Sequence, residues 1–226
     1  MIAALSFNSR ALGIKAYALA AEKAVHFILK NLRRFDGRLL ARFREGEAAI
    51  PGFLEDYAFF IWGLLELYQA LHKPQYLRLA LELNQEMLEL FWDEGQGGFF
   101  QYGSDTEELV VRPKEIYDGA LPSGNSVALY NLVRLSRLTG DPQLEKKAQA
   151  MFKAFAGPVS QSPAAHTFFL LGLYLEEAGA GEVTVVASEA GKDTQEMLKL
   201  INSRFLPELF LVVKTEKTEK ELKDMM

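Results

Sequence analysis

The 226-residue sequence has no cysteine, no concentrated block of basic residues and no long apolar run. Without cysteine, the chain itself can form no disulfide, thiolate metal site or thiol redox centre. Its net charge is −5, whereas phosphate binding needs a concentrated cationic surface. The best apolar run, 57–65, stops at Glu66 and falls short of the roughly 18 residues of a membrane span. We therefore expect no nucleic-acid partner and no membrane partner.

The amino terminus also lacks features of a secreted protein. Residues 1–10 have neither the cationic start nor the long apolar core of a signal peptide. Hydrophobic residues make up 49% of the chain and charged residues 24%, which is ordinary for a globular protein. The sequence therefore predicts a folded, cytoplasmic protein.

Apolar residues recur with a helical period through most of the chain. Asp141-Pro142 and Ser162-Pro163 each place an N-cap residue before a proline that suits the first helical turn, and Ser123 can cap the helix that follows it. We predict helices at 1–10, 14–34, 53–71, 75–92, 124–139, 142–156 and 163–178.

The links between these helices alternate in length. Residues 72–74 and 140–141 form tight links, which join antiparallel helix pairs. Residues 35–52 and 93–123 form long links with strand-like alternation, such as RLLARF and EELVVRP. This alternation favours an (α/α) toroid, a ring of helical hairpins. Its inner helices would be 1–10, 53–71, 124–139 and 163–178, and all long loops would lie on one rim, at the N-terminal ends of the inner helices.

The pattern changes after Gly181. Residues 183–187 and 209–213 are typical of buried strands, and Asp193-Thr-Gln-Glu196 is typical of a capping box that opens a helix. Parallel pairing through this helix predicts a small βαβ unit. The fold class is therefore mainly α: a partial (α/α) toroid domain over 1–181, a βαβ extension over 182–213, and a charged tail over 214–226 that is either a frayed helix or disordered.

Three stretches carry a resemblance to a known family: Pro51-Gly-Phe-Leu-Glu-Asp-Tyr-Ala58, Phe91-Trp-Asp with Gly97-Gly-Phe-Phe100, and Arg112-Pro-Lys-Glu-Ile-Tyr-Asp-Gly-Ala-Leu-Pro-Ser-Gly-Asn-Ser126. They resemble the carboxy-terminal region of the YyaL-type proteins, also called the spermatogenesis-associated thioredoxin-like family, over residues 1–213. The resemblance implies part of a six-hairpin toroid, similar to those of N-acylglucosamine 2-epimerases and six-hairpin glycosidases. Family members also carry an amino-terminal thioredoxin-like domain.

This chain begins within that pattern, because residues 1–5 match the interior of a toroid helix. Part of a ring leaves inner-helix faces uncovered, and large apolar patches are rarely left open. We therefore expect self-association into a homo-oligomer, or pairing with a missing amino-terminal half.

Four residues are candidates for catalysis at the predicted rim. We expect Glu55, Asp56 and Asp118 to head inner helices on the side of the funnel, and paired carboxylates serve as general acid and base in glycoside hydrolysis or epimerisation. Acids in a first helical turn equally complement the helix dipole and cap amides. His166 opens the last inner helix, and a histidine that titrates near neutrality suits proton transfer; a lone histidine is more often structural.

The candidates for ligand binding are aromatic, cationic or amide-bearing residues on the same loops. Flat aromatic rings can stack on sugars, Arg112 and Lys114 can orient hydroxyls or a carboxylate, and Ser123 can equally be an N-cap. For Trp62 we favour the core. The ligand-binding candidates are Tyr57, Phe99, Arg112, Lys114, Tyr117, Ser123 and Asn125.

These observations leave two functions open. The first is a carbohydrate-related toroid of the sugar epimerase or glycosidase type, with a sugar at the rim of the inner helices. The second is a non-catalytic helical scaffold, for example a partner of a thioredoxin-like domain. No metal-site spacing and no nucleotide fingerprint occur, so we expect no metal and no cofactor. An enzyme predicts converging polar side chains in a funnel, and a scaffold predicts an apolar groove.

Overall fold

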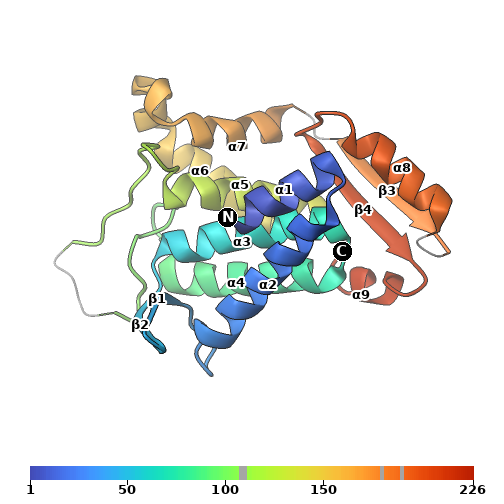
Figure 1. Cartoon of the computed structure of the whole chain (residues 1–226). Helices are drawn as coiled ribbons and strands as arrows, with labels where there is room; N and C mark the ends of the chain where they lie inside the picture. Colours follow the sequence, from blue (N-terminus) through green and yellow to red (C-terminus); the bar gives the residue numbers. More distant parts are fainter. Residues whose placement is uncertain (107–110, 179–180, 189–190) are drawn as a thin grey trace.

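The computed structural model describes residues 1–106, 111–178, 181–188 and 191–226. Two layers of helices form the larger part of the molecule (Figure 1). Four helices lie side by side in one layer, α1 on α3, α3 on α5 and α5 on α7, and each of the first three pairs with the next helix in the sequence. Their bounds are α1 Ile2–Leu12, α2 Lys15–Asn31, α3 Leu54–Leu71, α4 Pro74–Phe91, α5 Gly124–Thr139, α6 Pro142–Gln161 and α7 Thr167–Glu177. This is the predicted alternation of inner and outer helices in antiparallel hairpins.

The tight turns between paired helices have clear local causes. Gly13, His72 and Gly140 adopt the left-handed conformation that ends a helix, at φ of 69°, 54° and 72°. Pro74 and Pro142 then occupy the first position of the next helix, where the missing N–H costs nothing. At 72–73 and 140–141, a left-handed residue that ends one helix and a proline that starts the next therefore reverse the chain within two residues.

Two predicted helix boundaries were wrong. The helix predicted to end at residue 156 continues to Gln161. The fixed φ of Pro158 is itself helical, and its missing N–H removes only one backbone donor from the helix. The helix predicted over 163–178 divides into a short 3₁₀ turn, Pro163–Ala165, and α7, which begins at Thr167.

The first long link, 35–52, contains the predicted strand, whereas the described residues of the second, 93–106 and 111–123, form no strand beyond an isolated bridge between Trp92 and Phe99. The strands β1, Leu40–Arg44, and β2, Glu47–Pro51, form an antiparallel hairpin in which Arg42 pairs with Ala49. The strand-like stretch EELVVRP includes residues 107–110 and so lies partly outside the described residues.

The carboxy-terminal segment is the predicted βαβ unit. Strands β3, Gly181–Ala187, and β4, Leu209–Thr215, pair in parallel, and helix α8, Lys192–Asn202, crosses between them. Gly191 is the N-cap of α8, so the capping box predicted from Asp193 does not form. For residues 214–226, the structure has a short helix α9, Glu219–Lys223, instead of a disordered tail.

Alternation along β4 attaches this unit to the helices. Phe210 and Val212 pack into the main core, whereas Leu211 and Val213 face α8 in a separate small cluster. Leu222 of α9 also joins the main core. In the described part of the chain, every helix is too short or too polar to span a bilayer.

Candidate functional site at the ends of the inner helices

One loop segment, 115–118, crosses the rim and hydrogen-bonds at the N-terminal ends of two inner helices, α5 and α7, beside the start of α3. The Asn125 side chain at the start of α5 donates to the Glu115 carbonyl at 2.9 Å. His166, which precedes α7, hydrogen-bonds through Nδ1 to the Ile116 carbonyl at 3.0 Å. Glu55, in the first turn of α3, packs against the start of α5: a Cβ placed on Gly124 would lie 3.1 Å from the Cγ of Glu55. The rim predicted from loop lengths is therefore assembled (left side of Figure 1).

Asp118 joins two of these helix starts through its carboxylate. Oδ1 accepts from the Ser123 amide at 2.9 Å, at the N-cap of α5. Oδ2 accepts from the amides of Phe168 and Phe169 at 2.7 and 3.2 Å, in the first turn of α7. Asp118 therefore lies in the loop before α5 instead of heading a helix, and it caps α7 from outside that helix.

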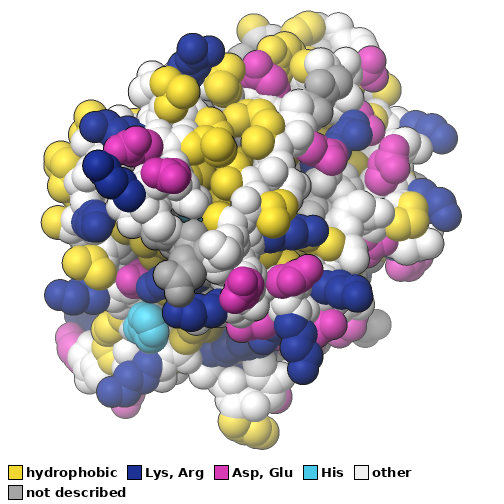
Figure 2. Space-filling model, turned by 90° about the vertical axis from the view of Figure 1, so that its right-hand side faces the viewer, with side chains coloured by type: hydrophobic (Ala, Val, Ile, Leu, Met, Phe, Trp, Pro, Cys, Tyr) yellow, Lys and Arg dark blue, Asp and Glu magenta, His cyan; other side chains and the backbone are white. Residues whose placement is uncertain are grey.

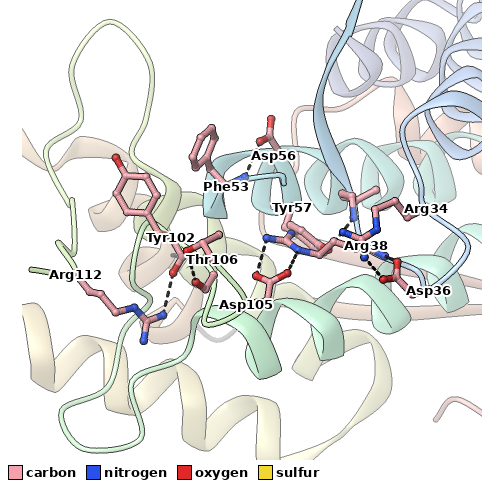
Figure 3. Close-up of polar contacts among 12 residues, drawn as sticks. Arg34, Asp36, Arg38, Phe53, Asp56, Tyr57, Tyr102, Asp105, Thr106 and Arg112 are labelled. Carbon is pink, nitrogen blue, oxygen red and sulfur yellow. Dashed lines mark hydrogen bonds and ion pairs between the residues drawn. The ribbon is translucent and has the colours of Figure 1, made fainter. Parts of the chain in front are cut away.

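The two acids at the start of α3 differ in exposure. Asp56 Oδ2 accepts from the Phe53 amide at 2.8 Å in a capping arrangement (Figure 3). Burial raises the pKa of Asp56, and the Phe53 amide and Arg38 oppose this. Glu55 is exposed, and partial desolvation, followed by the charges of Asp56 and Glu115, raises its pKa. Of the two carboxyls, Glu55 is the one that faces solvent.

His166 is held in a defined orientation, with only 6% of its surface exposed. A carbonyl oxygen can only accept, so the hydrogen bond to Ile116 makes Nδ1 the donor. In the neutral imidazole, Nε2 then carries the lone pair. The ring is therefore arranged to accept a proton through Nε2.

Four of the predicted ligand-binding residues are buried and hold the rim together. The Tyr57 hydroxyl accepts from the Leu39 amide at 3.0 Å. Asn125 accepts from the Phe99 amide at 2.8 Å and donates to the Phe99 carbonyl at 2.9 Å. Ser123 caps α5 through the Ser126 amide at 3.1 Å. These side chains position the rim loops and leave little or no surface for a ligand.

The other three predicted residues are closer to solvent. Arg112 donates to the Tyr102 carbonyl at 2.9 Å, 4.1 Å from the Phe100 ring (Figure 3 shows the hydrogen bond). Lys114 contacts Asp93 at 2.5 Å and the Gly97 carbonyl at 2.8 Å. Tyr117 is 61% exposed. Tyr117 is therefore the predicted aromatic residue best placed to meet a ligand.

An ion pair between buried Arg38 and exposed Asp105 was not predicted. Arg38 contacts both carboxylate oxygens of Asp105, at 2.8 and 3.2 Å (Figure 3). Its guanidinium lies 5.4 Å from the centres of the Tyr57 and Phe91 rings. Such bidentate pairs are strong and directional. The pair joins the segment before β1 to the long loop before α5. The two residues are 67 positions apart, so their pairing gave no local signal in the sequence.

A second unpredicted cluster lies on the inner helices near their C-terminal ends. Arg134 of α5 donates to Glu66 of α3 at 2.6 Å, and Arg10 of α1 approaches the other Glu66 oxygen at 3.3 Å. One turn nearer the rim, the rings of Trp62, Tyr130 and Phe168 lie 5.1–6.0 Å apart. Trp62, expected in the core, is half-buried, and its indole N–H has no hydrogen-bond partner in the described residues. Within that part of the chain, no three His, Cys, Asp or Glu side chains group as metal ligands.

Known proteins resemble the chain in sequence and in fold. No protein-family model matches it. Spermatogenesis-associated protein 20 of Mus musculus is 31% identical over 228 residues, which cover 94% of this chain and 28% of that protein. The chain thus spans little more than a quarter of that relative's length.

Two solved structures share the fold at low identity. The cellobiose 2-epimerase of Bacillus thermoamylovorans superposes with a TM-score of 0.57 at 18% identity, covering 68% of this chain and 42% of that one. The cellobiose 2-epimerase of Spirochaeta thermophila gives 0.54 at 20% identity, covering 69% and 42%. The predicted family resemblance is therefore confirmed: the chain is a relative of spermatogenesis-associated protein 20 over the shared segment, and its fold is part of an (α/α) toroid.

Proposed function

We propose that the chain is a carbohydrate-binding toroid segment of the sugar epimerase type, with its ligand at the rim formed by Glu55, Tyr117 and His166. The observation that carries this proposal is that residues 115–118 hydrogen-bond to Asn125 of α5 and to His166 before α7, while Glu55 of α3 lies beside Gly124 at the start of α5. Glu55, Tyr117 and His166 therefore lie at adjacent helix starts. The fold shared with cellobiose 2-epimerases supports it. Exposed Tyr117 offers a flat ring for a sugar face.

The chemistry follows from the two titratable side chains. Epimerisation next to a carbonyl requires a base that removes a proton from carbon and an acid that returns one to the opposite face. His166 accepts the proton at Nε2, because Nδ1 is committed to the Ile116 carbonyl. Glu55 serves as the acid, because its raised pKa favours the protonated form more than in an ordinary glutamate. Asp118 is a positioning residue that holds the loop onto α5 and α7.

The direct test is hydrogen exchange at C2 of a reducing sugar. We expect the chain, incubated with cellobiose or glucose in D₂O, to incorporate deuterium at C2, detected by NMR. In His166→Asn the amide can still donate to the Ile116 carbonyl but no longer accepts the proton, so exchange falls by about 10²-fold or more. His26→Asn, at an exposed position on α2, is the matched control and retains exchange. Absence of exchange and of sugar binding in the unmodified chain would refute the proposal.

One observation favours the scaffold function as the second candidate. Phe7, Leu12 and Leu19 leave large apolar side chains exposed on α1 and α2, which together form one edge of the helical layers. Exposed apolar groups of this kind mark association surfaces. If the chain associates through this edge, light scattering detects oligomers that Leu12→Glu and Leu19→Glu dissociate. A stable monomer that exchanges C2 hydrogen would leave only the first function.

A further inference from the structure

A cavity of about 340 Å³ lies at the opposite end of the inner helices from the rim. The loop between α8 and β4 closes it against α1, α3 and α5. Its lining includes Phe7, Arg10, Glu66, Tyr130, Arg134 and Arg204. The volume is within the range of sites for small molecules. Figure 2 looks onto this end of the molecule, where basic side chains lie close to a group of hydrophobic ones.

The charges around this cavity do not balance. Its ionisable lining is three arginines and one glutamate, which gives a formal charge of +2 in a chain whose net charge is −5. Glu66 gives one oxygen to Arg134 at 2.6 Å and the other to Arg10 at 3.3 Å. One carboxylate can neutralise only one of them. Desolvation lowers the pKa of Arg10; the charge of Glu66 opposes this effect, and the charge of Arg134 adds to it.

A purely structural reason for the arginines explains only part of this arrangement. Cations near the C-terminal end of a helix are stabilised by its dipole, but that effect is confined to the last turn. In α5 the last turn already holds Arg137, which pairs with Glu176 at 3.2 Å. Arg134 lies a turn deeper and is only 5% exposed. A buried ion pair is itself weak support for stability, and a single arginine would complete it.

We propose that this cavity binds a small organic anion, whose carboxylate or phosphate is held by Arg10, Arg134 and Arg204. Guanidinium groups present several N–H donors in a plane and match both anions with paired hydrogen bonds. Phe7 and Tyr130 offer apolar surface to the body of the ligand. The site is separate from the rim and does not depend on the proposed sugar chemistry.

Titration calorimetry on the whole chain tests this with four probes: inorganic phosphate, glucose 6-phosphate, glucuronate and glucose. We expect the anions to bind and neutral glucose not to bind at this site. Tighter binding of glucose 6-phosphate identifies a phosphate ligand, and tighter binding of glucuronate identifies a carboxylate. Because glucose also tests the rim, its binding is compared between the intact chain and the arginine variants, which leave the rim unchanged.

Two variants and one control make the assignment specific. Arg204→Gln changes an exposed loop residue and preserves the fold, and Arg10→Gln removes the less tightly paired guanidinium. Each weakens anion binding by about tenfold or more, the equivalent of a lost charged hydrogen bond. Arg78 pairs with Glu221 outside the cavity, so we expect Arg78→Gln to leave the anion affinity unchanged. Failure of every anion to bind, or equal affinity in Arg204→Gln and the unmodified chain, would overturn the proposal.

Discussion

The two ends of the inner helices use charge in opposite ways. At the N-terminal rim, the carboxylates of Asp56 and Asp118 accept hydrogen bonds from backbone amides, so their charge is used to fix the loops. At the C-terminal end, Arg10 and Arg134 share the single carboxylate of Glu66, so positive charge remains. The two rim carboxylates are therefore neutralised by backbone amides, whereas the opposite end keeps the excess positive charge that the proposed anion would balance.

This contrast changes how the motif of residues 112–126 is interpreted. Its members Asp118, Ser123 and Asn125 hydrogen-bond backbone groups, and two of them are buried. The motif encodes a loop that is hydrogen-bonded to the starts of α5 and α7. Only its exposed members, such as Tyr117, remain available to a ligand.

Glu66→Gln tests the contrast between the two ends most directly, and we expect it to lower the free energy of unfolding more than the other substitutions do. The change leaves Arg10 and Arg134 without a countercharge, which costs about 3–5 kcal/mol of unfolding free energy. Urea denaturation measures this loss. Because the cavity becomes more positive, inorganic phosphate stabilises the variant more than it stabilises the unmodified chain.

Glu94→Gln is the matched control, since its ion pair with Lys147 is on the surface and is worth at most about 1 kcal/mol. If Glu66→Gln unfolds at the same urea concentration as the unmodified chain, the positive charge at this end is already compensated, and the contrast between the two ends disappears.

Asn125→Ala tests the rim. The substitution removes three hydrogen bonds, to the Phe99 amide, the Phe99 carbonyl and the Glu115 carbonyl, and leaves these buried or half-buried groups without partners. We expect a loss of about 3 kcal/mol in urea denaturation. Gln149→Ala on the surface of α6 serves as the control and changes stability little. A loss below about 1 kcal/mol would show that the rim loop is held by other contacts.

Most of the fold could be predicted from local patterns. The left-handed turns at Gly13 and Gly140, the proline starts at 74 and 142, and the alternation of β4 are each visible within a few residues. A wrong helix boundary arose where one residue type is compatible with both a helix end and a helix interior. The helix predicted over 142–156 continues through Pro158 to Gln161, because the φ that proline already has is a helical one.

The site was harder to predict because charge pairing depends on distance in space. The rim was found through its loops, but the roles of Asn125 and Tyr57 depend on partners in other elements. Arg10, Glu66 and Arg134 lie 56 and 68 positions apart and belong to no motif. Only the parallel arrangement of α1, α3 and α5 brings them together.

His72 gives the smallest of these effects and a reporter for the charge at the C-terminal end. It ends α3 at a φ of 54°, and its buried Nδ1 has no hydrogen-bond partner within the described residues. Burial, followed by the charge of Arg10, lowers its pKa from 6.5 to about 4. On acidification His72 is protonated in the unfolded chain at a higher pH than in the folded chain. The contribution of His72 to stability is therefore fully present above pH 6.5 and is lost as the pH falls towards 4.

Between pH 7 and pH 5 the unfolding free energy linked to His72 falls by about 2 kcal/mol. We expect His72→Asn to abolish this loss, because asparagine does not titrate and tolerates the left-handed conformation. Urea denaturation of both chains at the two pH values measures the difference. An NMR titration reads the His72 pKa directly, with His72→Asn identifying its signal among the three histidines. We expect Arg10→Gln to raise that pKa. A pKa near 6.5 in the unmodified chain would mean that the C-terminal end is solvated and its charge screened, so that it resembles the rim after all.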